Sequence, residues 1–173
     1  MRLAAGRMTA RSGIGYDSHR LVAGRRLVLG GVEVPSERGL AGHSDADVLT
    51  HAVIDALLGA AALGDIGAHF PDTEERWRDA DSIALLGEVR TLLAARGLKP
   101  VHLDATVICE APRLDPYRDA MRGRLARGAG LELQAVSVKF TTAEGMGFVG
   151  RGEGIAALAA ATVAEAAGGR PAG

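Results

Sequence analysis

Apolar side chains recur at helical spacing in three segments of the chain. The longest run follows Ser44, and its apolar positions are Val48, Leu49, Ala52, Val53, Ala56, Leu57 and Ala60. Ser44 is the predicted N-cap of this helix, with Asp47 as the acidic member of a capping box. The spacing predicts a helix that continues to about Leu63 and ends at Gly64.

Two further helices are predicted downstream. One is capped by Ser82 and closed by Gly97. Its apolar stripe consists of Leu85, Leu86, Val89, Leu92 and Leu93. The other begins at Asp115-Pro116, an N-cap followed by a proline at the first helical position. Met121 and Leu125 are the inward positions of that helix.

Period-two alternation predicts strands in other parts of the chain. Ile14 and Tyr16 alternate with glycine in a strand that runs into Asp17 and His19. A hairpin is predicted around Gly30-Gly31. The predicted strands and hairpin occupy residues 12–19, 25–34, 101–108 and 136–141, and the predicted loops occupy residues 38–42, 65–73 and 110–114.

The last long stretch, residues 154–167, is rich in alanine, and helix propensity alone predicts a helix there. Along the rest of the chain, helices and strands interleave. This order predicts an α/β fold of the α+β type, in which helices pack on one face of a mixed β-sheet.

Composition narrows the class of protein. The 173 residues suffice for one domain with a proper core, and 20 Lys+Arg against 21 Asp+Glu give a formal net charge of -1. We therefore expect no nucleic-acid partner and no membrane partner. One cysteine, Cys109, excludes an intramolecular disulfide and fits a reducing cytoplasm. The expected organisation is a loose N-terminal extension (1–11), a single domain (12–167) and a flexible tail (168–173).

Three residues form a candidate metal site. Asp17 and His19 lie two apart on a strand, so their side chains leave the backbone on the same side. His51 lies on the first predicted helix, flanked one turn away by Asp47 and Asp55, either of which could accept the other ring N–H. Two histidines and a carboxylate suit a zinc ion with an open fourth position. The alternative is that these residues merely end a strand and decorate a helix.

Other polar clusters suit an anionic ligand. His43-Ser44 precedes a helix, where free N–H groups attract anions, although Ser44 can also be a simple cap. Residues 141–144 (Thr-Thr-Ala-Glu) offer hydroxyls and a carboxylate for a phosphate with bound Mg²⁺. Residues 145–154 are rich in glycine but do not follow the P-loop pattern, and a turn-rich joint is the alternative.

Six motifs occur in one order along the chain. They are GYDSH (15–19), AGHSDADV (41–48), DALLGAAALGDIG (55–67), HFPDT (69–73), VKFTTAE (138–144) and GFVGRGEG (147–154). Together they resemble the 2-C-methyl-D-erythritol 2,4-cyclodiphosphate synthase family, from about Arg11 to the alanine-rich run. The resemblance makes residues 154–167 a strand, against their helix propensity, and we adopt that prediction because packing can override propensity.

The resemblance implies a phosphorus-oxygen lyase of non-mevalonate isoprenoid (terpenoid) biosynthesis. Such enzymes convert 4-diphosphocytidyl-2-C-methyl-D-erythritol 2-phosphate into the cyclic diphosphate by attack of the 2-phosphate on the β-phosphate, and they release CMP. By position, Asp17, His19 and His51 would bind Zn²⁺, and Glu144 would bind Mg²⁺ or Mn²⁺. His43 and Thr142 match the family's transition-state stabilisers and are the predicted catalytic residues.

The resemblance also assigns the substrate contacts. The predicted substrate-binding residues are Asp17, Ser18, His19, His43, Ser44, Asp65, Ile66, Gly67, Phe70, Pro71, Asp72, Thr73, Glu74, Cys109, Glu110, Ala111, Pro112, Arg113, Leu114, Asp115, Thr141, Thr142, Ala143, Glu144, Phe148 and Arg151. Arg113 stands where the family often has lysine, and Ala143 where some members have threonine. Residues 109–115 align with the family's cytidine pocket.

In that family the cytidine pocket belongs to the neighbouring subunit, so the resemblance implies a homotrimer with active sites at the subunit interfaces. Phe148, Arg151 and Glu153 match residues around a central cavity on the three-fold axis, where family members can hold an isoprenoid diphosphate. Two rival functions are a zinc-dependent phosphohydrolase that uses metal-bound water, and a trimeric module that binds isoprenoid diphosphate with only a structural zinc.

Overall fold

The computed structural model describes residues 9–166. Within this range, five strands form the main sheet in the order β4-β1-β7-β5-β6, and β2 and β3 pair separately. The strands are β1 (Ala10–Ala23), β2 (Leu27–Leu29), β3 (Val32–Val34), β4 (Arg38–Leu40), β5 (Leu98–Ile108), β6 (Val136–Thr141) and β7 (Gly154–Glu165). The helices are α1 (Val48–Ala60), α2 (Ile66–His69), α3 (Ser82–Ala95), α4 (Arg118–Ala129) and α5 (Gly147–Gly150).

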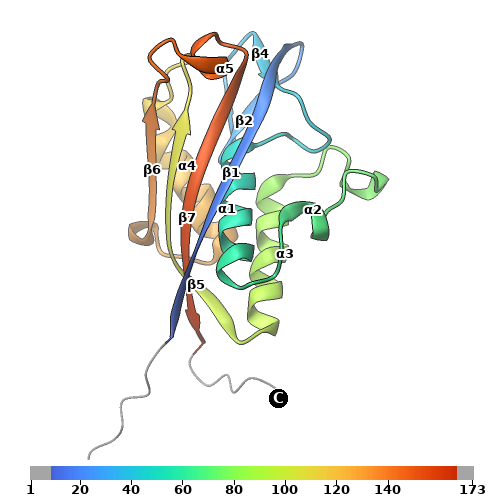
Figure 1. The fold of residues 1–173 in the computed structure, drawn as a ribbon, viewed down its shortest axis with the longest axis vertical. Coiled ribbons are helices and arrows are strands. Elements are labelled where there is room, and N and C mark those ends of the chain that lie inside the picture. Colours follow the sequence, from blue (N-terminus) through green and yellow to red (C-terminus); the bar gives the residue numbers. More distant parts are fainter. Residues whose placement is uncertain (1–8, 167–173) are drawn as a thin grey trace, which may run out of the picture.

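The main sheet is mixed, as predicted. β7 runs antiparallel to both β1 and β5, whereas β5 and β6 are parallel. The first and last strands of the described range therefore lie side by side at the centre of the molecule (Figure 1). The alanine-rich segment is a strand, and the prediction that set packing above propensity is confirmed.

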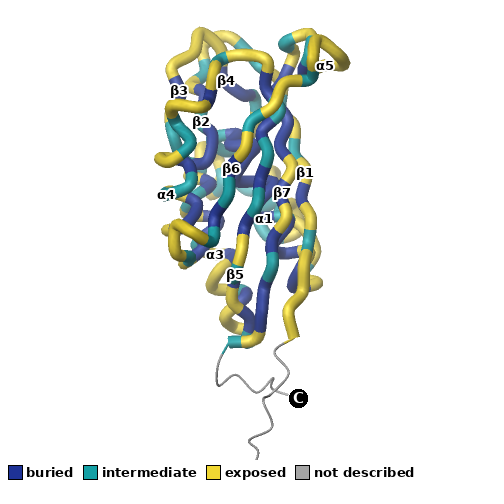
Figure 2. The backbone as a smooth tube through the Cα atoms, turned by 90° about the vertical axis from the view of Figure 1, so that its left-hand side faces the viewer, coloured by how far each residue is buried: buried dark blue, intermediate teal, exposed yellow. Residues whose placement is uncertain are grey.

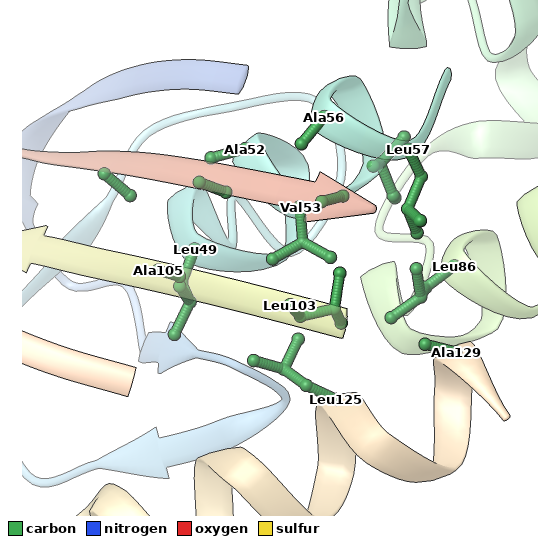
Figure 3. Packing of buried hydrophobic residues seen from close by; sticks show 14 of the residues in the cluster. Leu49, Ala52, Val53, Ala56, Leu57, Leu86, Leu103, Ala105, Leu125 and Ala129 are labelled. Carbon is green, nitrogen blue, oxygen red and sulfur yellow. The ribbon is translucent and has the colours of Figure 1, made fainter. Parts of the chain in front are cut away.

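The helices α1, α3 and α4 pack on one face of this sheet (Figure 1). Figure 3 shows the layer of buried side chains between these helices and the sheet, where α1 packs against β5 and β7. Its labelled side chains are Leu49, Ala52, Val53, Ala56 and Leu57 of α1, Leu86 of α3, Leu103 and Ala105 of β5, and Leu125 and Ala129 of α4. These residues form the core, and α1 carries His51 on the same rigid scaffold.

Two glycines allow β1 to approach α1 closely. A Cβ atom on Gly13 would overlap the backbone of Ala56 and Ala60, and one on Gly15 would overlap the backbone of Ala52. The glycines that alternate with Ile14 and Tyr16 are thus the residues that face the helix. This close approach brings Asp17 and His19 of β1 next to His51 of α1.

The opposite face of the sheet is open in the single chain. Ile14 is 82% exposed, Tyr16 53% and Leu158 47%. Tyr16 and Leu158 are paired residues of β1 and β7, so they form one apolar patch together with Ile14. Figure 2 shows these strands from the side: β1 consists mostly of exposed and intermediate residues, whereas most residues of β7 are buried.

The first helix begins later than predicted. Its N-cap is Asp47, whose carboxylate accepts a hydrogen bond from the Thr50 backbone N–H at 3.0 Å, and the helix ends at Ala60 instead of Leu63. The prediction that Ser44 caps this helix is wrong. Asp47 also accepts the backbone N–H groups of Gly30 and Gly31 at 2.8 and 2.7 Å, so it anchors the predicted hairpin to the helix.

Several other boundaries differ from the prediction. Residues 38–40 are strand β4, which pairs with β1, and the predicted loop 65–73 contains α2. Asp81, one residue before Ser82, caps α3. Asp115–Tyr117 form a 3-10 turn ahead of α4 and do not cap it.

Only the N-terminal limit of the predicted domain lies within the described residues. β1 starts at Ala10, so Ala10 and Arg11 of the predicted extension pair with β7. The predicted tail, residues 168–173, lies outside the described residues. Between residues 9 and 166, no helix has the length and apolar character needed to cross a membrane.

Candidate metal centre and adjoining pockets

Asp17, His19 and His51 converge on one point. The Asp17 Oδ2 atom lies 2.9 Å from His19 Nε2 and 3.0 Å from His51 Nδ1, and the two ring nitrogens are 3.3 Å apart. Two of the residues come from β1 and the third from α1. The three candidate metal ligands, which were chosen from strand periodicity and from a predicted helix, therefore lie together in the structure.

The triangle has the dimensions of a metal site. In a tetrahedral site with bonds of about 2.0–2.2 Å, ligand atoms lie roughly 3.3–3.5 Å from one another. The three atoms, 2.9 to 3.3 Å apart, need only small adjustments to reach that spacing. Two imidazole nitrogens and one carboxylate oxygen also suit a transition metal that keeps an open position. These residues therefore fit a divalent metal ion.

The electrostatics of the triangle favour a charged carboxylate. Burial by itself would raise the pKa of Asp17, but hydrogen bonds to His19 and His51 hold that pKa well below its ordinary value. Burial would likewise lower the pKa of His51, yet the nearby carboxylates, Asp17 above all, raise it. The negative charge of Asp17 is thus available to a cation at neutral pH.

The other nitrogen of His51 faces two hydroxyl groups. His51 Nε2 lies 2.9 Å from Ser82 Oγ and 3.2 Å from Ser44 Oγ. The prediction that Asp47 or Asp55 accepts this ring N–H is wrong, because both carboxylates are engaged elsewhere. Asp47 caps α1, and Asp55 accepts the Ile66 backbone N–H at 2.8 Å.

The triangle opens into a pocket of about 420 Å³, here called the metal pocket. It is lined by Asp17, His19, Gly42, His43, Ser44, His51, Asp55, Ile66, Gly67, Phe70, Asp72, Trp77 and Leu85. Many of the predicted substrate residues thus lie together around the metal ligands. His43 lies there as well, with its Nε2 atom 3.3 Å from the Glu74 carbonyl oxygen.

A second hollow of about 350 Å³, the loop pocket, is lined by eight further predicted substrate residues together with Phe140. It is lined by Cys109, Glu110, Pro112, Arg113, Leu114, Asp115, Phe140, Thr141 and Thr142. Glu144 and Ala143 join it through hydrogen bonds: Thr142 Oγ1 donates to Glu144 at 2.8 Å, and the Ala143 N–H donates to Glu110 at 2.7 Å. No residue lines both this pocket and the metal pocket.

The Cys109 side chain is buried against the loop pocket. Burial raises the pKa of its thiol to about 11, and the Sγ–H donates to the Ala111 carbonyl oxygen at 3.1 Å. The protonated, buried thiol helps to shape the loop pocket.

A third hollow, here called the small pocket, lies between the second half of β1 and the segment that contains α5. Ser18, His19, Arg20, Phe148 and Glu153 line it. The Arg151 guanidinium donates to the Glu153 carboxylate at 2.7 Å. Phe148 and Glu153 therefore line one hollow, and Arg151 joins them through its ion pair with Glu153.

Comparisons with known proteins agree with this geometry. The model of the YgbB family matches residues 10–164. The chain belongs to the YgbB family. A curated relative from Salinibacter ruber, "2-C-methyl-D-erythritol 2,4-cyclodiphosphate synthase", is 62% identical over 156 residues, which is 90% of this chain and 99% of that protein. The family prediction is confirmed.

Solved structures show the same fold as this YgbB-family chain. A structure titled as a 2C-methyl-D-erythritol-2,4-cyclodiphosphate synthase with CDP bound aligns with a TM-score of 0.81 and 40% identity, covering 88% of this chain and 99% of that one. The bifunctional IspDF from Campylobacter jejuni aligns with a TM-score of 0.88 and 37% identity. That alignment covers 91% of this chain but only 43% of the bifunctional protein.

The sequence did not identify several residues in and around the metal pocket, among them Ser82 and Trp77. Ser82 was identified only as a helix cap, and Trp77 was not considered. Ser82 lies 31 positions from His51, and no local spacing connects them. Trp77 could have been singled out, because it is the one tryptophan of a chain with few aromatic residues and it lies three residues after Glu74, the last predicted substrate residue of its loop.

Proposed function

We propose that this chain is a 2-C-methyl-D-erythritol 2,4-cyclodiphosphate synthase, a lyase of non-mevalonate isoprenoid biosynthesis. The observation that carries the proposal is the Asp17–His19–His51 triangle on the floor of a pocket that also holds His43 and the predicted substrate loop. The near full-length identity to synthases of that name supports it.

The proposed reaction joins two ends of one substrate. A 2-phosphate oxygen of 4-diphosphocytidyl-2-C-methyl-D-erythritol 2-phosphate forms a bond to the β-phosphorus. The bond from that phosphorus to the bridging oxygen breaks, and CMP leaves with the electron pair. Such a transfer needs positioning and charge neutralisation more than a protein nucleophile, which agrees with the burial and raised pKa of the Cys109 thiol.

We assign the triangle to zinc, because two histidines and one carboxylate form a common catalytic zinc set. A zinc ion bound there would act as a Lewis acid toward the β-phosphate. His43 and Ser44 line the same pocket, and we assign them to the 2-phosphate. We assign Asp72, with Ile66 and its neighbours, to the methylerythritol hydroxyls.

We assign the loop pocket to the cytidine and its phosphates. Thr142 would donate to phosphate oxygens as charge develops, and Glu144 would hold Mg²⁺ or Mn²⁺. The related synthase structure with CDP bound shows that this fold accommodates a cytidine nucleotide. Arg113 is 90% exposed at its side chain, so it can reach a ligand in place of lysine.

The two pockets suggest that a complete site needs more than one chain. A substrate with a cytidine at one end and a methylerythritol phosphate at the other must reach both, yet they share no lining residue. The exposed apolar patch of Ile14, Tyr16 and Leu158 provides a surface for association. We therefore propose a homotrimer in which the loop pocket of one chain completes the metal pocket of the next.

The remaining assignments are also proposals. The small pocket would form part of a central cavity, where Arg151 could face an isoprenoid diphosphate; its guanidinium is paired with Glu153 in the single chain. The functional unit would be one domain over residues 12–167. A reducing cytoplasm is the proposed location, since the one cysteine is a free buried thiol.

Phosphorus NMR tests the function directly. The full chain is incubated with the cytidyl substrate, Zn²⁺ and Mg²⁺, and the expected products are a cyclic diphosphate and CMP in equal amounts. His51→Ala is the control, and it should lose both metal and turnover. Orthophosphate as the product would instead indicate a phosphohydrolase, and full activity after chelation of all metal would overturn the assigned role of the triangle.

A further inference from the structure

The imidazole of His51 can offer a metal only one of its two nitrogens. Its Nδ1 atom points at Asp17 and His19, so a metal in the triangle requires a lone pair on Nδ1 and the proton on Nε2. In free imidazole both tautomers are accessible, and the partner of the second nitrogen selects one of them. The question is which group makes this selection.

The hydrogen bonds around Ser82 determine which neighbouring group receives its hydroxyl proton. Ser82 is fully buried, and its Oγ atom lies within hydrogen-bonding distance of Asp45 Oδ1 as well as 2.9 Å from His51 Nε2. A carboxylate can only accept, so the Ser82 hydroxyl donates its proton to Asp45. The Ser82 oxygen then presents a lone pair to His51, and His51 Nε2 must be the donor.

Asp45 is itself held in place. Its Oδ2 atom accepts the Ser82 backbone N–H at 2.9 Å, and its Oδ1 atom accepts the Asp47 backbone N–H at 3.2 Å. The Asp45 backbone N–H donates to the Ala80 carbonyl oxygen at 3.2 Å. The carboxylate therefore cannot turn away from Ser82 without losing several hydrogen bonds.

We propose that Asp45 and Ser82 are positioning residues that fix the His51 tautomer through a directed chain, from His51 Nε2–H to the Ser82 hydroxyl to the Asp45 carboxylate. The proposal rests on the assignment of the triangle as a metal site. A consequence concerns Ser44, the second hydroxyl near Nε2, at 3.2 Å. Because Ser82 takes the imidazole proton at the shorter distance, Ser44 can turn its own proton toward a substrate phosphate.

Zinc affinity of the full-length metal-free chain, measured by competition with a chromophoric chelator, tests the chain of hydrogen bonds. Ser82→Ala should weaken zinc binding by about 10- to 100-fold, the usual effect of removing such a partner. Asp45→Asn should weaken it too, because an amide N–H directed at Ser82 would reverse the serine and favour a proton on His51 Nδ1. The zinc affinity of the double variant should be no lower than that of the single variant with the lower affinity.

The matched control is Asp81→Ala. Asp81 caps the same helix end through the Ile83 N–H at 2.9 Å but has no hydrogen bond to His51 or Asp45. It should lower the melting temperature and leave zinc affinity unchanged. If Ser82 only secures the start of α3, Ser82→Ala will behave like this control, and the proposal is overturned.

Nitrogen NMR of the zinc-loaded chain reads the tautomer itself. Wild type should show a protonated Nε2 and a metal-bound Nδ1 at His51, and Ser82→Thr, which keeps the hydroxyl, should retain both zinc affinity and this signature. A metal-bound Nε2 in wild type would overturn the proposal. These measurements use zinc alone, so a chain that binds zinc as expected but forms no cyclic diphosphate would refute the proposed function and leave this inference standing.

Discussion

Thr142 lines the loop pocket, and its hydroxyl group acts as a hydrogen-bond donor in the single chain. Its Oγ1–H donates to Glu144 at 2.8 Å, and the same oxygen lies 3.3 Å from the Glu144 backbone N–H. A bound metal at Glu144 would compete for that carboxylate and free the hydroxyl for a phosphate oxygen. The proposed role of Thr142 is to stabilise charge that develops only during transfer.

Thr142→Ala should therefore lower kcat by about 100-fold and change KM little, because the lost interaction belongs to the transition state. Steady-state kinetics with the cytidyl substrate separates the two constants. Thr142→Ser keeps the hydroxyl and should restore most of the rate. A raised KM at unchanged kcat would move Thr142 from catalysis to ordinary substrate binding.

Single residues also show what the sequence could predict about the site. Asp17, His19 and His51 were found because strand and helix periods fix the directions of their side chains within each element. Ser82 was missed as a partner of His51 because that contact depends on how α3 packs against α1, which no local period encodes. Asp47 was one of two predicted acceptors for the second ring N–H of His51, whereas its carboxylate accepts hydrogen bonds from Thr50 and the hairpin.

At the scale of elements, β7 shows how packing decides between strand and helix. Alanine has the highest helix propensity, yet this segment lies between β1 and β5 and pairs with both. Gly13 pairs with Ala161 and Gly15 with Ala159, so small residues form the surface on which α1 lies. The family motifs predicted this strand, but composition alone could not, because the reason for small side chains is a helix about 100 residues away.

The contact between β1 and α1 gives a prediction at the same scale. Gly15→Ala should destabilise the fold by about 3 kcal/mol, because the added Cβ would meet the backbone of Ala52 and lie 2.8 Å from the Ala56 nitrogen. Neither backbone segment can yield without moving the helix that carries His51. Urea unfolding at fixed protein concentration measures the loss.

The control for this substitution is Gly87→Ala in α3. An added Cβ there meets nothing within 4 Å, and alanine favours a helix over glycine by about 0.5–1 kcal/mol, so the variant should be slightly more stable than wild type. If both variants unfold at the same urea concentration, close packing of β1 on α1 is not what the glycines provide.

At the scale of the whole molecule, the two separate pockets and the open sheet face are the features on which the proposed homotrimer rests. The three candidate ligands of the metal triangle come from one chain, so the proposed metal site takes these ligands without a partner. In the proposed reaction the substrate also contacts the loop pocket, which shares no lining residue with the metal pocket. Assembly should therefore control turnover and leave metal binding intact.

Leu158→Asp tests this separation. Leu158 lies between Tyr16 of β1 and Thr106 of β5 on the open face, and a carboxylate there would have to be desolvated in any tight interface. We expect light scattering to show a shift from three 17.8 kDa chains to one, and turnover to fall by about 100-fold or more because the substrate loses half of its positioning contacts. Zinc affinity should stay at the wild-type value.

Leu133→Asp provides the comparison that makes this result interpretable. Leu133 is 42% exposed, close to the 47% of Leu158, but it lies in the turn before β6 and not among the β1 and β7 residues of the apolar patch. It should leave both the trimer and turnover unchanged. A Leu158→Asp chain that is monomeric and fully active would show that one chain contains a complete site, because it would work without the loop pocket of a neighbour.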